Sequence, residues 1–316
     1  MHRLPFDRPG RFYRGNLHTH SDQSDGRLTA DAVVNLYRDA GYDFLSMTDH
    51  FLPGHRFRKT VDFIDVTDIS AHTCDCFLTI PGAEIHGPAL SNGEPWHFVA
   101  AGLPLDFPRL GENETGPEIA ARAHSAGAFV AAAHPHWYAM TLDDIRPVLP
   151  VVHAIETYNH ACTGVDRTDS WYTLDELLGA GDGSQLTAIA TDDAHFKPHI
   201  GEPVNALGGW VMVRADRLDQ DAILDALKAG HFYSSTGPEL YDVRIDGDEL
   251  VVECSPVESI VATGRGAKSQ PVHQSGQTSA RLPLEKFVAD GYFRVTVRDA
   301  NGKRAWTNPI WLDRAN

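Results

Sequence analysis

The chain has 316 residues, of which 42% are hydrophobic and 22% are charged, and its formal net charge is −16 at pH 7. This length and composition are typical of a soluble globular protein with one large domain and one small one. The negative charge argues against a nucleic-acid duplex as partner, because binding the phosphate backbone needs a basic surface. A small anionic substrate stays possible, since bound divalent cations can reverse the local charge.

No targeting segment or membrane helix is expected. The first 12 residues contain three arginines and two prolines but no apolar core, unlike a secretory signal. No run approaches the roughly 20 apolar residues of a membrane helix. The four cysteines are irregularly spaced, and Cys74-Asp75-Cys76 has no second pair, so two ordinary thiols are favoured over a thiolate metal site. A cytoplasmic location is expected.

Short apolar runs alternate with helical patterns from residue 14 to about 237, which is typical of a βα-repeat fold with a parallel sheet. Strands are predicted at 15–18, 44–48, 77–80, 97–101, 128–133, 151–157, 186–190 and 209–213, and helices at 29–40, 117–126, 142–148, 170–178 and 219–229. Thr29 and Asp219 are expected N-caps. Gly41, Gly127 and Gly230 stand where these helices end. Seven or eight such units favour a closed barrel over an open sheet.

The pattern changes past Gly237-Pro238. Short alternating runs occur at 240–245, 250–254, 259–263, 281–283, 292–298 and 305–312, with turn signals at Asp246-Gly247 and Asn301-Gly302. A helical pattern interrupts them only at 284–288. We therefore expect a large domain at residues 1–238 and a small all-β, sandwich-like domain at residues 239–316. The expected role of the small domain is to pack against the first, with substrate recognition or oligomer contact as alternatives.

The stretch Gly15-Asn16-Leu17-His18-Thr19-His20 carries the first candidate metal ligands. Side chains on a strand repeat every two residues, so His18 and His20 point to the same side. Two neutral imidazoles on one face are a metal-ligand arrangement, and Asp25 in the following loop can add an oxygen. A surface strand that happens to carry two histidines is the alternative interpretation, and the rest of the chain decides between them.

Residues of metal-binding type recur where the predicted strands end. The strand at 44–48 leads into Asp49-His50, that at 77–80 into Gly82-Ala83-Glu84, that at 128–133 into His134, and that at 186–190 into Asp193-Ala194-His195. Barrel enzymes assemble their sites at this rim. His97 is an exception, because it starts its own apolar run. Five segments that deliver His, Asp or Glu to one rim predict a cation site.

These motifs resemble those of the polymerase and histidinol phosphatase (PHP) family of metallohydrolases. The resemblance rests on His18-x-His20, Ser24-Asp25-Gly26, Thr48-Asp49-His50, Gly82-x-Glu84, His97, Ala133-His134-Pro135 and Asp193-x-His195. It covers roughly residues 14–200, with all nine ligand types in order. Within the superfamily, the stretch at 15–20 and Phe232-Tyr233-Ser234-Ser235-Thr236-Gly237-Pro238 resemble the branch that includes the carbaryl and carbofuran hydrolases.

The resemblance implies a distorted (β/α)7 barrel that holds two or three divalent cations. It assigns His18, His20, Glu84 and Asp193 to one cation, Glu84, His97 and His134 to a second, and Asp25, His50 and His195 to a third, with His20, Glu84, Asp193 and His195 as the catalytic residues. Mixed imidazole and carboxylate ligands suit Mn, Fe or Zn. A bridging carboxylate lets two cations lie roughly 3.5–4 Å apart, where they make hydroxide available near neutral pH.

Several neighbours of these residues have alternative roles. His86 can replace His97 as a ligand, being two residues past Glu84 on the same strand face, although His97 matches the family. Asp193 rather than Asp192 fits the Asp-x-His spacing. Asp49 is expected to orient a ligand histidine. Glu156 and Asn159 are expected either to line the pocket or to form an ordinary polar loop. The candidates to bind an anionic leaving group, each of which is better explained alone as a surface residue, are His136, His160, Lys197, His199, Arg56 and Arg58.

The expected function is a metal-dependent hydrolase, and the expected substrate is a small phosphate ester, because a multi-cation site suits phosphoryl oxygens. Hydrolysis of a carbamate or carboxylic ester is the alternative, with the cations stabilising a tetrahedral oxyanion. A non-catalytic metal-binding module is a third possibility, against which the complete ligand set argues. The sequence contains no phosphate-binding loop and no Gly-x-Ser-x-Gly elbow. Neither a nucleic-acid nor a membrane partner is expected, and no oligomeric state is predicted.

Overall fold

The computed structural model describes residues 4–52, 65–111, 113–183, 186–197 and 205–312, and within these ranges it is a mixed α/β protein with six α-helices. Arg56, Arg58 and His199, three of the anion-binding candidates, lie outside the described residues. Within the described ranges, each helix is too short or too polar to cross a membrane. The four cysteines are free thiols.

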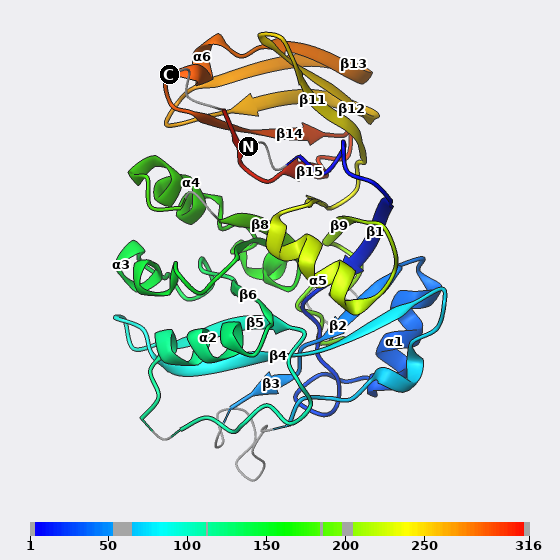
Figure 1. Ribbon diagram of the computed structural model, residues 1–316, viewed down its shortest axis with the longest axis vertical. Helices are drawn as coiled ribbons and strands as arrows, with labels where there is room; N and C mark the ends of the chain where they lie inside the picture. Colours follow the sequence, from blue (N-terminus) through cyan, green and yellow to red (C-terminus); the bar gives the residue numbers. More distant parts are fainter. Residues whose placement is uncertain (1–3, 53–64, 112, 184–185, 198–204, 313–316) are drawn as a thin grey trace.

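Helices and strands alternate in the first part of the chain, and strands dominate after it (Figure 1). The first part contains β1 (Arg11–Asn16), α1 (Ala30–Asp39), β2 (Phe44–Met47), β3 (His50–Phe51), β4 (Leu78–Ala89), β5 (Pro95–Ala101), α2 (Gly116–Ser125), β6 (Phe129–Ala132), α3 (Leu142–Ile145), β7 (Ala154–Asn159), α4 (Trp171–Ala180), β8 (Thr187–Thr191), β9 (Trp210–Ala215), α5 (Gln220–Ala229) and β10 (Phe232–Ser235). The second contains β11 (Leu240–Asp246), β12 (Glu249–Thr263), β13 (Ser269–Pro283), α6 (Glu285–Val288), β14 (Tyr292–Arg298), β15 (Arg304–Thr307) and β16 (Ile310–Trp311).

The predicted capping residues fix the helix ends. The side chains of Thr29 and Asp219 accept hydrogen bonds from backbone N–H groups in the first turns of α1 and α5. Gly41, Gly127 and Gly230 follow α1, α2 and α5 with φ values of 80°, 91° and 75°. Only glycine adopts this left-handed conformation without a steric cost, so it ends the helices here. These predictions are confirmed.

The strands form one sheet in the order β11-β12-β14-β15-β10-β9-β1-β2-β4-β5-β6-β7-β8. The pairs β1–β2, β2–β4, β6–β7 and β7–β8 are parallel, as predicted. The pairs β4–β5, β5–β6 and β1–β9 are antiparallel, so the prediction of a wholly parallel sheet is wrong there. Between β4 and β5 the chain has only a short turn, closed by a 2.6 Å hydrogen bond from Leu90 N–H to Glu94 O. A parallel crossover needs a dozen or so residues, which this turn lacks.

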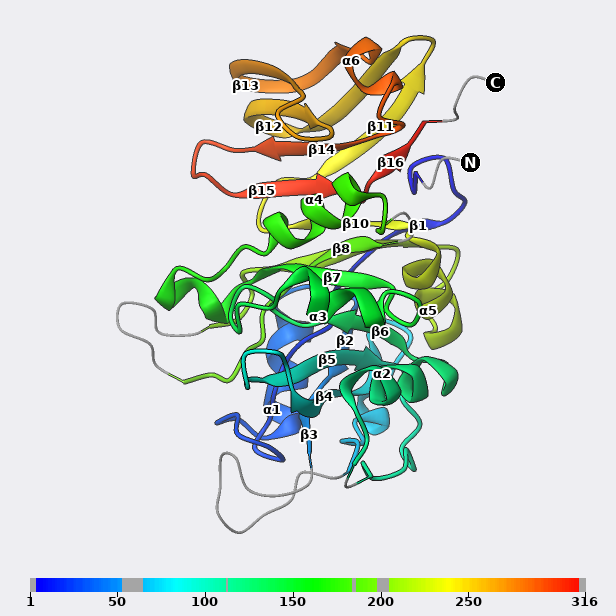
Figure 2. The same cartoon turned by 90° about the vertical axis from the view of Figure 1, so that its left-hand side faces the viewer.

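One buried core is shared by β1, β2 and β4 to β9. It contains Leu17, Phe44, Ile80, Val99, Phe129, Ile189 and Val211, together with Ile223 and Leu227 of α5. The last strand in the order, β8, is tied back to β10 by Ser234, whose hydroxyl accepts from Ala190 N–H at 3.1 Å and donates to Ala188 O at 2.8 Å. The sheet therefore curves around a common interior. Helices α2 and α4 contribute to a separate cluster outside it (Figure 2).

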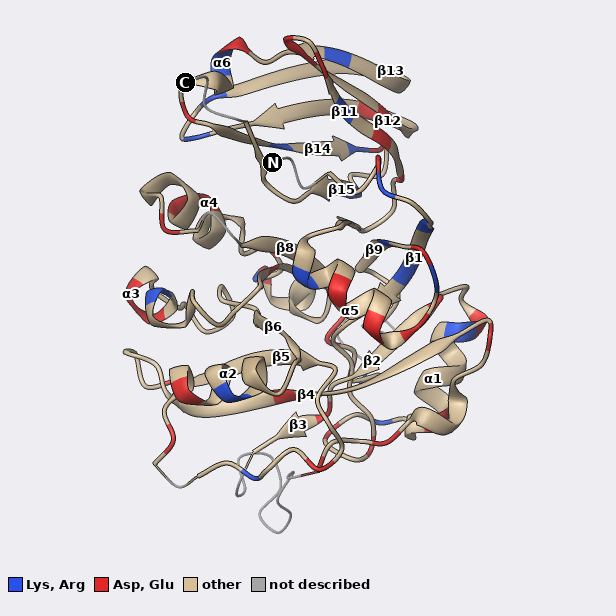
Figure 3. Ribbon diagram, in the orientation of Figure 1, with Lys and Arg blue, Asp and Glu red and all other residues tan. Residues whose placement is uncertain are grey.

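The part after residue 238 has strands at the predicted runs and a short helix, α6, at the predicted position, but the run at 305–312 is divided into β15 and β16. Two of its strands are longer than expected. β12 joins the runs at 250–254 and 259–263, and β13 was predicted only at 281–283 because most of its side chains are polar and exposed. Strand β15 pairs with β10, so both parts belong to one hydrogen-bonded sheet. Acidic and basic residues are interspersed over both parts (Figure 3).

Candidate metal centre

The nine predicted ligand positions lie together in space. His18 and His20 follow β1, Asp25 lies before α1, His50 opens β3, Glu84 and His97 lie within β4 and β5, His134 follows β6, and Asp193 and His195 follow β8. His97 reaches this rim although it lies near the start of its strand, because β5 runs antiparallel to its neighbours. Glu84 lies inside β4, so the predicted strand end at residue 80 is wrong.

The loop that carries His20 and Asp25 is held by Asp49. The carboxylate of Asp49 accepts hydrogen bonds from the backbone N–H and hydroxyl of Ser21, both at 2.7 Å, and from the hydroxyl of Ser24 at 2.6 Å. We predicted that Asp49 orients a ligand histidine; these hydrogen bonds reach the loop around His20 rather than an imidazole, so any such role is indirect. Because its oxygens bind the loop instead, Asp49 acts on the centre by fixing the backbone around His20.

Two of the candidate ligands have left-handed backbones. Asp193 has a φ of 53° and His134 a φ of 29°. For residues other than glycine such conformations cost on the order of 1–3 kcal/mol each, and they cluster at functional sites. Each is held by a hydrogen bond from its own N–H, Asp193 to His18 O at 2.8 Å and His134 to the Glu156 carboxylate at 2.7 Å.

The carboxylate of Glu84 lies among six imidazoles. Its Oε1 is 2.5 Å from Nδ1 of His97, 3.0 Å from Nε2 of His134 and 3.5 Å from Nε2 of His18, and its Oε2 is 2.6 Å from Nδ1 of His50, 3.6 Å from Nε2 of His20 and 3.7 Å from Nε2 of His86. Each oxygen thus faces a different set of nitrogen ligands. A carboxylate in this position is placed to bridge two cations.

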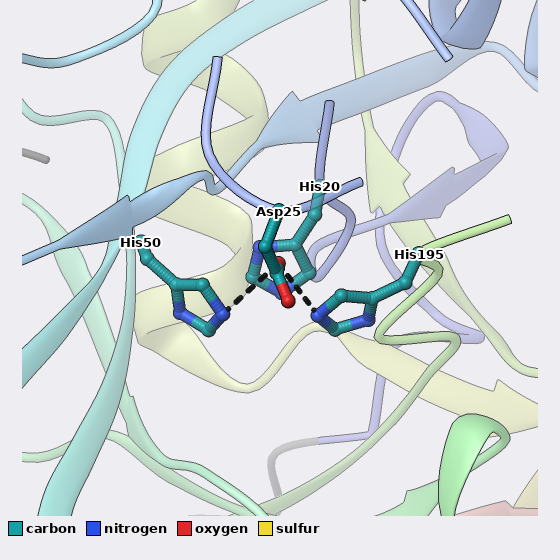
Figure 4. Close-up of side chains that lie close together, drawn as sticks. All are labelled: His20, Asp25, His50 and His195. Atoms are coloured by element: carbon teal, nitrogen blue, oxygen red, sulfur yellow. Dashed lines mark ion pairs between the residues drawn. The ribbon is translucent and has the colours of Figure 1, made fainter. Parts of the chain in front are cut away.

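His20, Asp25, His50 and His195 form the most complete cluster of ligand atoms, all within 4.8 Å of one another (Figure 4). Oδ1 of Asp25 lies 3.0 Å from Nε2 of His195 and 3.3 Å from Nε2 of His50. The ring of His20 lies 4.1 Å from that of His195 and 4.4 Å from that of His50, measured between centroids. The structure therefore brings together the residues predicted for the third cation and adds His20 to them.

The residues predicted for the first cation also lie side by side. Nε2 of His20 is 3.0 Å from Oδ1 of Asp193, and Nε2 of His18 is 3.4 Å from the same oxygen. His18, Glu84 and His134 form another group of close ligand atoms. His20 thus belongs to two neighbouring groups, which places it between two potential cation positions.

Both His86 and His97 enter the centre. They face each other across β4 and β5, with ring centroids 3.8 Å apart. His86 forms a group of close ligand atoms with His50 and Glu84. His97 contacts Glu84 through Nδ1, and its Nε2 lies 3.2 Å from the hydroxyl of Tyr138. Geometry admits either histidine as a ligand, and the choice of His97 stays a prediction.

Glu156 supports the centre through hydrogen bonds to the candidate ligands His18 and His134. Its fully buried carboxylate lies 2.8 Å from Nδ1 of His18 and accepts hydrogen bonds from Thr191 Oγ1, His134 N–H and Asn159 Nδ2. Asn159 also donates to Asp193 at 3.0 Å. A carboxylate on one ring nitrogen fixes the tautomer and orientation of a ligand histidine, leaving the other nitrogen for a cation. From the sequence, an ordinary polar loop was as good an interpretation of Glu156 and Asn159 as a role in lining the pocket.

Burial and charge act in opposite directions on the carboxylates. Burial acts to raise the pKa of Glu84, but the imidazoles of His97 and His50 outweigh it and hold this pKa well below the ordinary value. Burial likewise opposes ionisation of Asp193, and the neighbouring His18 outweighs it, so the pKa of Asp193 is lowered. These carboxylates are therefore ionised, and they stabilise positive charge beside them.

The histidines divide into two kinds. Burial acts to lower the pKa of His18, yet the carboxylates around it, first Asp193, raise it well above the ordinary value. Against the same effect of burial, Glu84 raises the pKa of His50 to about 10. Burial and neighbouring imidazoles lower the pKa of His20 to about 4. Neutral imidazoles bind metals, so cation binding has to displace protons from His18 and His50.

The donor atoms fit divalent transition metals. Oδ1 of Asp25 and Oε2 of Glu84 are buried and face imidazole nitrogens, and Nε2 of His18 is buried without a hydrogen-bond partner among the described residues. All three belong to side chains of the ligand clusters. Imidazole nitrogens mixed with carboxylate oxygens suit Mn, Fe or Zn, whereas Ca and Mg prefer oxygen ligands. The residues present thus fit the cations that the resemblance implies, while the number and identity of the ions stay predictions.

A cavity of about 260 Å³ opens above the centre. Its lining consists of Asp25, His50, Glu84, His97, His134, Trp137, Tyr138, Ala161, Cys162, Asp193, His195, Lys197 and Asn205. Among the described anion-binding candidates, Lys197 lines the cavity, and its Nζ lies 2.6 Å from Oδ2 of Asp25. His136 is exposed, and Nδ1 of His160 is 3.1 Å from the hydroxyl of Tyr158. Neither of these two histidines lines the cavity.

Some lining residues were missed by the sequence analysis. Trp137 and Tyr138 follow His134 on the same loop, and this short spacing after a candidate ligand was the available signal. Asn205 lies far along the chain and accepts hydrogen bonds from the N–H groups of His195 and Phe196. Nothing in the local sequence of Asn205 indicates that it lines the cavity, because this depends on how loops distant in sequence fold together.

Asp192 points away from the centre, as predicted. Its buried carboxylate accepts hydrogen bonds from Asn16 Nδ2 at 2.6 Å, from Tyr37 Oη at 2.7 Å and from the backbone N–H groups of residues 207–209 at 2.8 Å. It therefore joins β1, α1 and the segment before β9. Asp193 is left to face the imidazoles, which confirms the predicted division between the two.

Comparison with known proteins adds a fold relationship. No protein-family model matches the sequence, and no curated protein matches it either. In structure, the chain is similar to a two-domain protein from Bacteroides vulgatus that contains a predicted PHP-like metal-dependent phosphoesterase, with 16% identity, a TM-score of 0.52, and coverage of 96% of this chain and 98% of that one. An amidohydrolase from Chromobacterium violaceum gives 16% identity and a TM-score of 0.41 over 60% of this chain and 89% of its own. The first similarity shows that the two chains share their general α/β fold.

Proposed function

We propose that this chain is a metal-dependent hydrolase of phosphate esters. The observation that carries the proposal is the position of Glu84, whose two oxygens face separate sets of imidazoles. The family resemblance and the description of the Bacteroides vulgatus protein as a PHP-like phosphoesterase support the choice of substrate. The same resemblance supports assigning the curved sheet of residues 1–238 to the distorted (β/α)7 barrel and residues 239–316 to a small β domain.

In this proposal the ligand positions divide as the resemblance implies, into His18, His20, Glu84 and Asp193, then His97 and His134 with Glu84, then Asp25, His50 and His195. Bound divalent cations supply Lewis acidity and a water of lowered pKa as the nucleophile. The chain itself orients the ligands: Glu156 holds His18, and Asp49 holds the loop of His20. Trp137 and Tyr138 add aromatic walls to the cavity beside the centre.

A second candidate is hydrolysis of a carbamate or carboxylic ester at the same centre. The cavity walls favour it, because Trp137, Tyr138, Ala161 and Cys162 offer mostly apolar surface to a leaving group. In addition, the ammonium of Lys197 is engaged with Asp25. A phosphate monoester then depends on the cations alone, within the described residues, to balance its charge.

The test is hydrolysis of three chromogenic substrates, a phosphomonoester, a phosphodiester and an aryl carbamate, by protein loaded with Mn, Fe or Zn. His20→Ala removes an imidazole shared by two ligand groups and serves as the blank. His273→Ala, at an exposed position on β13, is the matched control. We expect phosphate turnover that His273→Ala keeps and His20→Ala loses.

Each outcome discriminates between the candidates. Turnover of the carbamate alone would move the ester hydrolase to first place. Metal binding without turnover of any substrate would favour a non-catalytic module. Phosphate turnover that survives in His20→Ala at the wild-type rate would contradict the site assignment.

A further inference from the structure

Lys197 is the one lysine or arginine among the described residues that line the cavity. Its Nζ lies 2.6 Å from Oδ2 of Asp25, and 36% of its side chain is exposed against 13% for Asp25. The pair joins the loop after β8 to the loop before α1. Because the Lys197 side chain is only partly buried, we take its contact with Asp25 as the interaction that fixes the ammonium.

The two oxygens of Asp25 have different surroundings. Oδ2 is held by Lys197, whereas Oδ1 is buried and faces Nε2 of His195 at 3.0 Å and Nε2 of His50 at 3.3 Å. A carboxylate fixed through one oxygen presents the other to a cation in one orientation. Metal-binding carboxylates are commonly hydrogen-bonded in this way by a second group.

The backbone that carries Lys197 is itself fixed. Asn205 accepts hydrogen bonds from the N–H groups of His195 at 3.2 Å and Phe196 at 2.8 Å. Phe196 has a left-handed φ of 57°, and its ring packs in the buried cluster beside α1. The segment from His195 to Lys197 is therefore directed back over Asp25, with a candidate ligand and the ammonium on the same short stretch.

We propose that Lys197 is a positioning residue that holds Oδ2 of Asp25, so that Oδ1 completes a cation site with His20, His50 and His195. The inference rests on the proposed metal centre and adds a role that the ligand set does not contain. The ammonium also repels a nearby cation. The proposal therefore requires that the orientation of Asp25 outweighs this repulsion, which gives the test a definite direction.

The experiment is a calorimetric titration of metal-free protein with Mn²⁺, with the bound ions counted by elemental analysis. Lys197→Met keeps the aliphatic stem and removes the ammonium. We expect it to weaken one class of site by on the order of tenfold or more, the usual effect of removing such a supporting group, and to leave the other sites unchanged. Lys197→Arg keeps a charged donor and should recover part of the affinity.

Lys268→Met is the matched control. Lys268 contacts Asp290 at 2.7 Å, with 42% and 12% of the two side chains exposed, so this pair resembles Lys197–Asp25 but lies in the second part of the chain. It should bind Mn²⁺ as the wild type does. If methionine at position 197 prevents folding, Lys197→Gln provides the same comparison.

Unchanged affinity of every site in Lys197→Met would overturn the inference. Tighter binding at one site would overturn it as well, since it would mean that the ammonium only repels the cation. A wild-type protein that binds none of Mn²⁺, Fe²⁺ or Zn²⁺ would instead contradict the proposed metal centre. The two failures are therefore distinguishable.

Discussion

Nδ1 of His18 lies 2.8 Å from Oε1 of Glu156, and both side chains are fully buried. Both carboxylate oxygens of Glu156 accept hydrogen bonds. In Glu156→Gln an NH₂ group, which only donates, replaces one of these oxygens, so at least one donor loses its acceptor. His18 then loses its fixed orientation. We expect the affinity for Mn²⁺ to fall about 10-fold to 100-fold. Calorimetric titration measures this, and Glu253→Gln, at an exposed position, is the control. Wild-type affinity in Glu156→Gln would exclude a positioning role.

Removing the metal should destabilise the protein. Ions that bind the native state alone stabilise it by about 2.7 kcal/mol for a site held at 100 times its Kd. We therefore expect a chelator to lower the Tm of metal-loaded protein. The same chelator should change the Tm of Glu84→Gln much less, because Glu84 contacts both sets of imidazoles. A wild-type Tm that is insensitive to the chelator would mean that ions add nothing to folding.

Asp192→Asn should be strongly destabilising. The carboxylate accepts five hydrogen bonds, from Asn16, Tyr37 and the N–H groups of residues 207–209, and an amide NH₂ would point a donor at some of them. Each buried donor that loses its acceptor costs about 1–3 kcal/mol. Urea unfolding measures the loss, with Asp225→Asn at an exposed position of α5 as the control. A loss below about 1 kcal/mol, the range of a single neutral hydrogen bond, would contradict the structural role.

His153 should make the fold sensitive to acid. Burial, followed by the charges of His124 and Lys228, lowers the pKa of His153 from 6.5 to about 4. Its Nδ1 accepts a hydrogen bond from Val130 N–H at 3.1 Å, which protonation breaks, and its ring stacks on His124 and Phe129. The folded state binds the proton more weakly than the unfolded state does. The stability is therefore fully present above pH 6.5 and is lost as the pH falls towards 4.

Urea unfolding of the wild type and of His153→Gln at pH 7.5 and pH 5 checks this dependence. The variant should lose less stability than the wild type between the two values. His273→Gln, which changes an exposed histidine, should follow the wild type. Equal losses in all three proteins would show that His153 does not contribute to the acid sensitivity.

The sequence predicts the positions of strands and helices better than it predicts strand direction. Periodicity and capping residues such as Thr29 are local, so the helices were found. The antiparallel pairing of β5 with β4 depends on the short turn at 90–94. This turn does not predict strand direction from sequence, because the sequence does not show which strands are neighbours. Most of β13 was missed for another reason, because an exposed edge strand has no apolar face to give alternation.

The candidate centre was predicted more completely than its supports. Histidines and carboxylates at strand ends are visible as residue types, and the structure brings all nine together. Lys197 was one candidate among several, and Glu156 was left open, because their roles depend on which atoms they contact across the fold. The contacts of Asp49 with Ser21 and Ser24 were not predicted, since they follow from a loop conformation that spacing does not encode.

The joint between the two parts limits how the gene can be cut or recombined. Strand β15 supplies the ladder partner of β10, and Asn308 accepts from Ala188 N–H and donates to Phe232 O. Trp306 is fully buried against Trp171, on a helix of the first part. A chain ended at residue 238 would leave a bare strand edge and an uncovered apolar surface, both of which promote aggregation. Replacement of the second part by another sequence therefore requires a strand that pairs with β10 and a side chain that replaces the contacts of Asn308.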